Sequence, residues 1–280
     1  MPVDFISSHP YPTTYPLDGQ DNVFEMTRPY ECLKMDVSWL NKTTFESKFN
    51  NAEIHLTEWS SSPSPRDHTH DYLPAATYIV RANLDCEEMV NSMSYWTFTD
   101  VFEEGGAGDS IFHGGFGLIN YQGIVKPSFH AYRFLNQLGD EKISSGEGYI
   151  ITRSSKTNKI SAILYHYPSD VTTAIPLSKG SRTTAENLMK KGVPRNFTLE
   201  INGFQTNSSF EVDILDENHG NAIKSWTKMG MPNTPDREQT EQLKKEALDT
   251  WKFEIFSDKT GKLIWNKELL PWSVVFIKEK

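Results

Sequence analysis

The chain has 280 residues, of which 37% are hydrophobic and 23% are charged. These proportions describe a globular protein, and the length suits one large domain or two ordinary ones. A net charge of −9, a pI of about 5.4 and a mean hydropathy of −0.53 argue against a nucleic-acid-binding surface and against a membrane span.

The two cysteines, Cys32 and Cys86, are too few for a disulfide framework, so we expect reduced thiols. The first residues, Met1 to Phe5, have neither the basic region nor the apolar stretch of a signal peptide. A cytoplasmic protein is therefore the default expectation, provided that the natural amino terminus is not missing.

From residue 1 to about 140, strand-like runs alternate with helical stretches. We expect strands at 3–7, 52–57 and 92–97, and helices at 29–49, 71–84 and 129–138. This order is typical of parallel βαβ units. Polar and aromatic residues gather just after each strand, which is the end that holds the active site of a (β/α)₈ TIM barrel. Three such units make only part of a barrel.

After about residue 141, short β-like runs separated by turn-rich segments predict an antiparallel β-sandwich with one inserted helix. The helix is expected to begin at Thr234, as N-cap, with Pro235 in its first turn. The expected strands lie at 148–153, 160–166, 197–201, 209–215, 251–256 and 273–278. The predicted fold is therefore α/β plus all-β, with a partial barrel at 1–140 and a sandwich at 141–280.

Glu58 is the strongest candidate for chemistry because it ends an expected strand, next to Trp59 and directly before a Ser/Pro loop. A retaining glycosidase uses one carboxylate to attack the anomeric carbon and a second to protonate the leaving oxygen. Taken alone, a glutamate at a strand end is more often exposed or salt-bridged than catalytic.

Several motifs resemble the β-xylosidases of glycoside hydrolase family 39. The segment His55–Ser60 (HLTEWS) is similar to the strand that carries the family's nucleophile, and Ser94–Glu104 (SYWTFTDVFEE) resembles the motif of its eighth barrel strand. The similarity continues at Phe112–Leu118 and Val3–Tyr11, and at 214–221 with Trp226. It therefore runs through nearly the whole chain.

The resemblance implies that Glu58 is the nucleophile and that xylose or a xylo-oligosaccharide is the substrate. It also implies that His9 and Tyr11 line the sugar pocket, that Trp96 forms an apolar wall, and that Glu103 and Glu104 accept hydrogen bonds from sugar hydroxyls. The alternatives are a core aromatic for Trp96 and a solvated acidic pair for the two glutamates. Asp100 stays unassigned, and neither a metal nor an organic cofactor is expected.

The chain also departs from the family pattern. The family usually has a tyrosine in the loop after the nucleophile, near Pro63, and the loop 105–109 is richer in glycine than usual. The family's acid/base lies in an Asn-Glu-Pro motif at the end of strand four, and no such motif occurs here. The sequence begins at what resembles strand six, so we expect little or no xylosidase activity from the isolated chain.

Three other interpretations stay open. The first is another family 39 specificity, such as β-glucosidase or α-arabinosidase; α-iduronidase fits less well because the pocket motifs contain no Arg or Lys to pair with a substrate carboxylate. The second is a non-catalytic carbohydrate-binding or assembly module, and the third is an inert pseudo-enzyme. A homo-oligomer is one option that the sequence does not decide.

Two histidine motifs have competing explanations. The tract Asp67–Asp71 (DHTHD) resembles a zinc-binding pattern, but its place between Pro65 and an expected helix favours helix capping and loop polarity. His113 stands before Gly114 and Gly115, and we interpret it as a structural or pocket histidine rather than a catalytic base.

Overall fold

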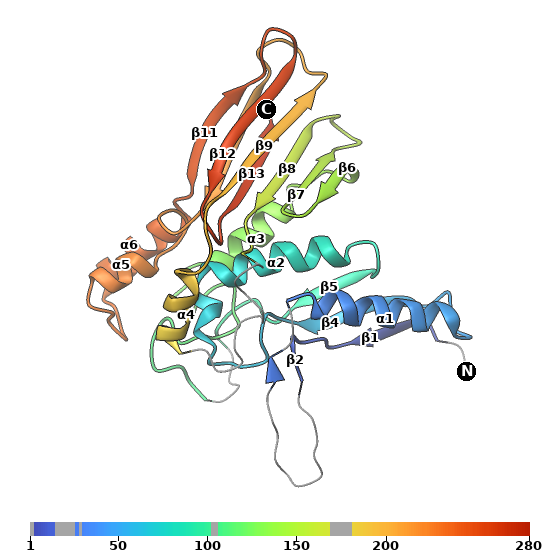
Figure 1. The fold of residues 1–280 in the computed structure, drawn as a ribbon. Coiled ribbons are helices and arrows are strands. Elements are labelled where there is room, and N and C mark those ends of the chain that lie inside the picture. Colours follow the sequence, from blue (N-terminus) through green and yellow to red (C-terminus); the bar gives the residue numbers. More distant parts are fainter. Residues whose placement is uncertain (1–2, 15–25, 28–29, 102–105, 169–180) are drawn as a thin grey trace.

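The computed structural model describes residues 3–14, 26–27, 30–101, 106–168 and 181–280. Figure 1 shows a parallel sheet with helices in the first half of the chain and long antiparallel strands in the second half. Within the described residues, no helix is both long and apolar enough to cross a membrane.

The first half contains a three-stranded parallel sheet in the order β1-β4-β5. Helices connect or follow these strands, as the alternating pattern predicted. A short two-stranded ladder, β2 with β3, lies between β1 and α1. The elements are β1 (Phe5–Ser8), β2 (Thr13–Thr14), β3 (Met26–Thr27), α1 (Cys32–Glu46), β4 (Glu53–Trp59), η1 (His68–Asp71), α2 (Leu73–Cys86), β5 (Ser92–Tyr95) and α3 (Pro127–Leu135).

The second half is antiparallel. A six-stranded sheet has the order β11-β10-β13-β8-β7-β6, and a two-stranded sheet pairs β12 with β9. The elements are β6 (Glu141–Gly146), β7 (Tyr149–Arg153), β8 (Ile160–Tyr165), α4 (Arg182–Met189), β9 (Arg195–Asn202), β10 (Ser209–Leu215), α5 (Ile223–Lys228), α6 (Arg237–Leu248), β11 (Trp251–Phe256), β12 (Lys262–Leu269) and β13 (Val274–Glu279).

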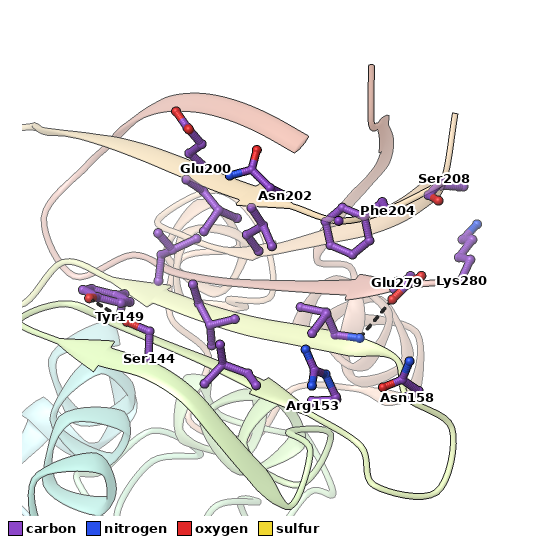
Figure 2. Close-up of a pocket in the computed structure, with 18 of the residues that line it drawn as sticks. Ser144, Tyr149, Arg153, Asn158, Glu200, Asn202, Phe204, Ser208, Glu279 and Lys280 are labelled. Atoms are coloured by element: carbon purple, nitrogen blue, oxygen red, sulfur yellow. Dashed lines mark hydrogen bonds between the residues drawn. The ribbon is translucent and has the colours of Figure 1, made fainter. Parts of the chain in front are cut away.

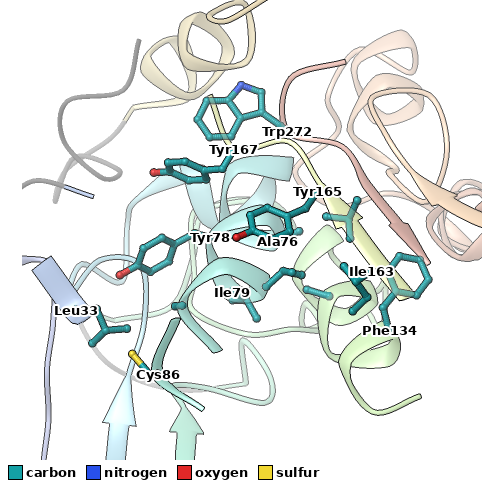
Figure 3. Packing of buried hydrophobic residues seen from close by; sticks show 14 of the residues in the cluster. Leu33, Ala76, Tyr78, Ile79, Cys86, Phe134, Ile163, Tyr165, Tyr167 and Trp272 are labelled. Carbon is teal, nitrogen blue, oxygen red and sulfur yellow. The ribbon is translucent and has the colours of Figure 1, made fainter. Parts of the chain in front are cut away.

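The six-stranded sheet has an apolar core on each face. On one face, Ile163 and Phe276 join a cluster with α2, and Phe134 of α3 stacks on Phe276 with 5.6 Å between ring centroids. Figure 3 shows this cluster, in which Tyr78, Tyr165 and Tyr167 lie near one another. On the other face, β8, β10 and β13 share a second cluster with β9 and β12. The first core therefore joins the two halves of the chain.

The helices of the second half differ from the prediction. α4 and α5 were not anticipated, because helices of eight and six residues are too short for a periodic pattern to identify. α6 begins at Arg237, so the expected N-cap at Thr234 and first turn at Pro235 are wrong. Asp236 is the N-cap instead, because its carboxylate accepts from the Gln239 amide while the Gln239 side chain accepts from the Asp236 amide.

Candidate active site

An irregularity near the end of β4 sets the direction of Glu58. Leu56 and Trp59 are both fully buried although they are three residues apart, and the register between β4 and β5 shifts between them. The Trp59 ring packs edge-on against Tyr95 of β5, with 5.4 Å between centroids. Because Trp59 points into this core, Glu58 lies on the opposite side, and 25% of its side chain is exposed.

The segment that follows β1 contacts the Glu58 carboxylate. Tyr11 donates its hydroxyl to Glu58 Oε1 at 2.6 Å, and His9 Nδ1 lies 3.7 Å from Oε2. His9 Nε2 is also 3.1 Å from the Thr57 hydroxyl. These contacts follow from the sheet order, because β1 and β4 are parallel neighbours whose carboxyl ends meet at one edge. The family resemblance assigns Glu58, His9 and Tyr11 to one pocket, and these three residues lie together.

Trp96 lies one residue beyond β5, at the same end of the sheet as Glu58. Its backbone amide donates to the Trp59 carbonyl at 2.8 Å, so the two strand ends are level. Trp96 is partly buried, and its place in the sugar pocket stays a prediction. Glu103 and Glu104 lie outside the described residues, so their assignment to the pocket stays a prediction.

A buried ion network, formed by Lys126, Asp71 and Asp100, lies beside the segment that follows β5. Lys126 Nζ is 2.7 Å from Asp71 Oδ1, 2.7 Å from Asp100 Oδ2 and 2.8 Å from the Gly115 carbonyl oxygen. All three charged side chains are fully buried. Burial alone would lower the pKa of Lys126, but the two carboxylates outweigh it and raise this pKa above its ordinary value.

The network fixes the glycine-rich segment after β5. The Gly114 amide donates to Asp71 and the Gly117 amide donates to Asp100, both at 2.7 Å. A Cβ at Gly117 would lie 2.3 Å from the Asp100 nitrogen, and Gly114 has a φ of +79°. The glycines of Phe112–Leu118 therefore allow a close backbone approach. Sequence analysis missed Lys126 and left Asp100 unassigned.

The Asp67–Asp71 tract serves local structure. Asp67 caps η1 by accepting from the Thr69 amide at 2.9 Å, as helix capping predicted. His70 is buried with Nδ1 at 3.0 Å from the Gly114 carbonyl oxygen, and burial lowers its pKa to about 4. His113 is likewise buried, with Nδ1 2.9 Å from the Ser110 carbonyl oxygen. Within the described ranges, no group of three or more His, Cys, Asp or Glu side chains is arranged to hold a metal ion.

We expect Asp67→Asn to gain stability relative to the parent chain as the pH rises from about 4 to 7. Burial raises the pKa of Asp67 to about 7 in the folded state, against 3.8 for an ordinary aspartate, although two hydrogen bonds from Thr69 oppose the shift. In that window the folded state binds more protons than the unfolded state, so the contribution of Asp67 to the free energy of unfolding falls as pH rises.

The expected change is on the order of 3–4 kcal/mol over the whole window. The pKa of His70 is lowered in the folded state, so the contribution of His70 to the free energy of unfolding rises with pH. His70 is present in both proteins, so this contribution cancels when the two are compared. Denaturant unfolding of both proteins at several pH values isolates the Asp67 contribution. If the difference in unfolding free energy between the two proteins stayed constant from pH 4 to 7, the raised pKa of Asp67 in the folded state would be contradicted.

The chain is similar to proteins of a known glycosidase family. The family model for glycosyl hydrolases family 39 matches residues 1–261. A β-xylosidase of Geobacillus stearothermophilus is 33% identical over 247 residues, covering 87% of this chain and 45% of that protein. A β-xylosidase of Caldicellulosiruptor saccharolyticus is 30% identical over 282 residues, covering 100% of this chain and 54% of that protein.

Solved structures agree with the fold. A monomeric β-xylosidase from Caulobacter crescentus superposes with a TM-score of 0.79 at 25% identity, over 100% of this chain and 56% of that chain. A GH39 enzyme from Xanthomonas axonopodis pv. citri superposes with a TM-score of 0.81 at 24% identity, over 100% and 55%. The chain thus spans about half the length of the curated relatives that it matches.

Proposed function

Because the chain belongs to glycosyl hydrolases family 39, we propose that it is the carboxy-terminal part of a retaining β-xylosidase in which Glu58 is the nucleophile. The observation that carries the proposal is the hydrogen bond from Tyr11 to a partly exposed Glu58 at the carboxyl end of β4. The names of two relatives, both β-xylosidases, support xylosides as the substrate class.

In this proposal the first half of the chain is a segment of a (β/α)₈ barrel. The strands β1, β4 and β5 are parallel, and each is followed by a helix, which suits strands six to eight of such a barrel. The two antiparallel sheets are then the accessory β-sandwich. The site lies at the carboxyl ends of the strands, as in other barrel enzymes.

The proposed reaction has two displacements. A Glu58 oxygen attacks C1 of the xyloside, the bond from C1 to the leaving oxygen breaks, and an acid group protonates that oxygen. Water then gives a proton to the conjugate base of that group and attacks C1, which releases Glu58 and xylose with retained configuration. Tyr11 orients the carboxylate through Oε1, while His9, Trp96, Glu103 and Glu104 contact the sugar.

We expect the group that protonates the leaving oxygen to lie in the part of the family's enzymes that this chain does not match. General acid catalysis typically contributes about 10²–10⁴-fold to the rate. An incomplete pocket also positions the sugar poorly, which lowers the rate further. We therefore expect the isolated chain to hydrolyse 4-nitrophenyl β-D-xyloside at close to the uncatalysed rate.

The test supplies the missing part as a separate polypeptide. In the test mixture, the segment of the Caldicellulosiruptor relative that lies outside the match is refolded together with this chain. In the positive control, the same segment is refolded together with the relative's own matched segment. We expect xyloside hydrolysis from both mixtures and from none of the polypeptides alone. Activity of the positive control without activity of the mixed pair would contradict the proposal. Xylose binding without turnover in that pair would instead favour a carbohydrate-binding module.

A further inference from the structure

Arg66 lies in the loop between β4 and η1, and its side chain reaches the segment that follows β5. Its Nη1 atom donates to the Pro65 carbonyl oxygen at 2.7 Å, and its Nη2 atom donates to the Gly106 carbonyl oxygen at 2.6 Å. Hydrogen bonds from a charged guanidinium are shorter and stronger than those between neutral groups. Arg66 therefore links the two loops that leave the carboxyl ends of β4 and β5.

Gly106 depends on this contact for its position. It is exposed, and a Cβ placed on it would have no atom within 4 Å, so that side of the residue faces open space. Within the described residues, the Gly106 backbone makes no other hydrogen bond. Its φ of +83° is a conformation that glycine adopts without strain. The hydrogen bond from Arg66 can therefore hold the Gly106 carbonyl without a steric cost.

The chain just beyond Gly106 is held separately, by packing on a buried side chain. A Cβ at Gly108 would lie 2.3 Å from His113 Nδ1, so the Gly108 backbone lies against this imidazole. The His113 side chain is buried, and it lines a small cavity together with Arg66 and Asp100. Arg66 thus joins the outer part of the segment to a region that is already fixed.

Two described residues flank the part of this segment that the proposed function uses. Asp100 is held on one side, because its Oδ2 atom is 2.7 Å from Lys126 Nζ. Gly106 is held on the other side by Arg66. The residues between them include Glu103 and Glu104, which the proposed function places against the sugar. A few residues span only a short distance, so a shift of either flank changes where these side chains can reach.

We propose that Arg66 is a positioning residue that raises the affinity of the site for xylosides by holding the Gly106 backbone. Its two hydrogen bonds go to backbone oxygens and not to Glu58, so its loss should affect substrate binding more than the chemical step. A substitution that raises KM and leaves kcat unchanged removes binding that the ground state and the transition state share. The effect on KM rests on the proposed function, whereas the contact with Gly106 does not.

The experiment compares Arg66→Gln with Arg153→Gln as the matched control. Both arginines are partly buried, but Arg153 lies on β7, in the groove between the antiparallel sheets that Figure 2 shows. Nuclear magnetic resonance relaxation of the full chain measures the order parameter of the Gly106 amide and needs no catalysis. Kinetics on 4-nitrophenyl β-D-xyloside use this chain with a saturating concentration of its complementing polypeptide.

We expect Arg66→Gln to lower the Gly106 order parameter from about 0.85, the value of a rigid backbone, to below about 0.6. KM should rise by at least about fivefold, while kcat stays within about twofold. Arg153→Gln should change none of the three. Millimolar guanidinium, which returns a planar donor to the vacated position, should restore part of the affinity lost by Arg66→Ala.

The inference is overturned if Arg66→Gln leaves the Gly106 order parameter unchanged, if kcat falls as much as kcat/KM, or if Arg153→Gln has the same effects. No hydrolysis by the parent mixture would instead contradict the proposed function, and with it the effect on KM. An altered order parameter in that case would still support the contact between Arg66 and Gly106.

Discussion

Replacing Glu58 with glutamine is expected to abolish xyloside hydrolysis by the completed enzyme. Glutamine keeps the size of the side chain and can still accept from Tyr11, but its neutral amide oxygen cannot form the glycosyl ester. Deletion of a catalytic group that acts directly on the substrate typically costs roughly 10⁴-fold or more in kcat. Initial rates on 4-nitrophenyl β-D-xyloside, measured with this chain and its complementing polypeptide, give the value.

Glu53→Gln is the matched control on the same strand. Glu53 lies at the other end of β4 and is more exposed than Glu58. Its Oε2 atom is 3.0 Å from His55 Nε2. We expect this variant to keep its activity within about twofold, since an exposed ion pair contributes little. More than a tenth of the activity remaining in Glu58→Gln would end the assignment of Glu58 as the nucleophile.

Azide separates a nucleophile from an acid/base. In Glu58→Ala the carboxylate is gone, so azide can attack C1 from the face that Glu58 occupied. That single displacement inverts the centre and yields the α-glycosyl azide. If Glu58 were the acid/base, azide would attack an intact glycosyl-enzyme, and the product would be the β-azide. Nuclear magnetic resonance of the product distinguishes the two anomers.

Local sequence patterns predicted most of the regular structure because the relevant signals are short in range. The expected strand at 52–57 is observed as β4 from Glu53 to Trp59, and the expected strand at 209–215 is β10 with the same ends. Both runs are rich in apolar and β-branched residues bounded by polar turns. Membership of glycosyl hydrolases family 39, suggested by the motifs, is confirmed by the family match.

Strands with many polar residues escaped prediction. β6 (EKISSG) and β12 (KLIWNKEL) were both missed, because β6 is an edge strand with five exposed positions and β12 carries charges on its outward face. Their stability comes from pairing with β7 and β9, which are partners that no short window of sequence contains. Tertiary pairing therefore decided these segments.

Residues of the candidate site that stand in one sequence motif could be predicted. Residues that only folding brings together from distant segments could not. Glu58 and Trp59 stand together in the sequence, and the resemblance brought in Tyr11. Lys126 comes directly before Pro127 and was not considered for the site. Its partners are 55 and 26 residues away, at Asp71 and Asp100, so only the folded chain reveals the network.

Lys126→Met is expected to be among the most destabilising substitutions in this protein. It leaves the carboxylates of Asp71 and Asp100 buried without their shared cation, and removing one member of a buried ion pair typically costs about 3–5 kcal/mol. The loss should shrink as the pH falls, because protonation removes the uncompensated charge. Urea unfolding at neutral and acidic pH measures both effects.

Lys262→Met is the matched control, because it removes a lysine that is 2.6 Å from Glu200 on the surface. An exposed pair contributes about 0–1 kcal/mol, so this loss should be small and nearly independent of pH. A third variant, Lys126→Met with Asp71→Asn and Asp100→Asn, makes the whole network neutral and should recover part of the stability lost by Lys126→Met. Equal losses for Lys126→Met and Lys262→Met would show that the buried network does not hold the Gly114–Gly117 segment against η1.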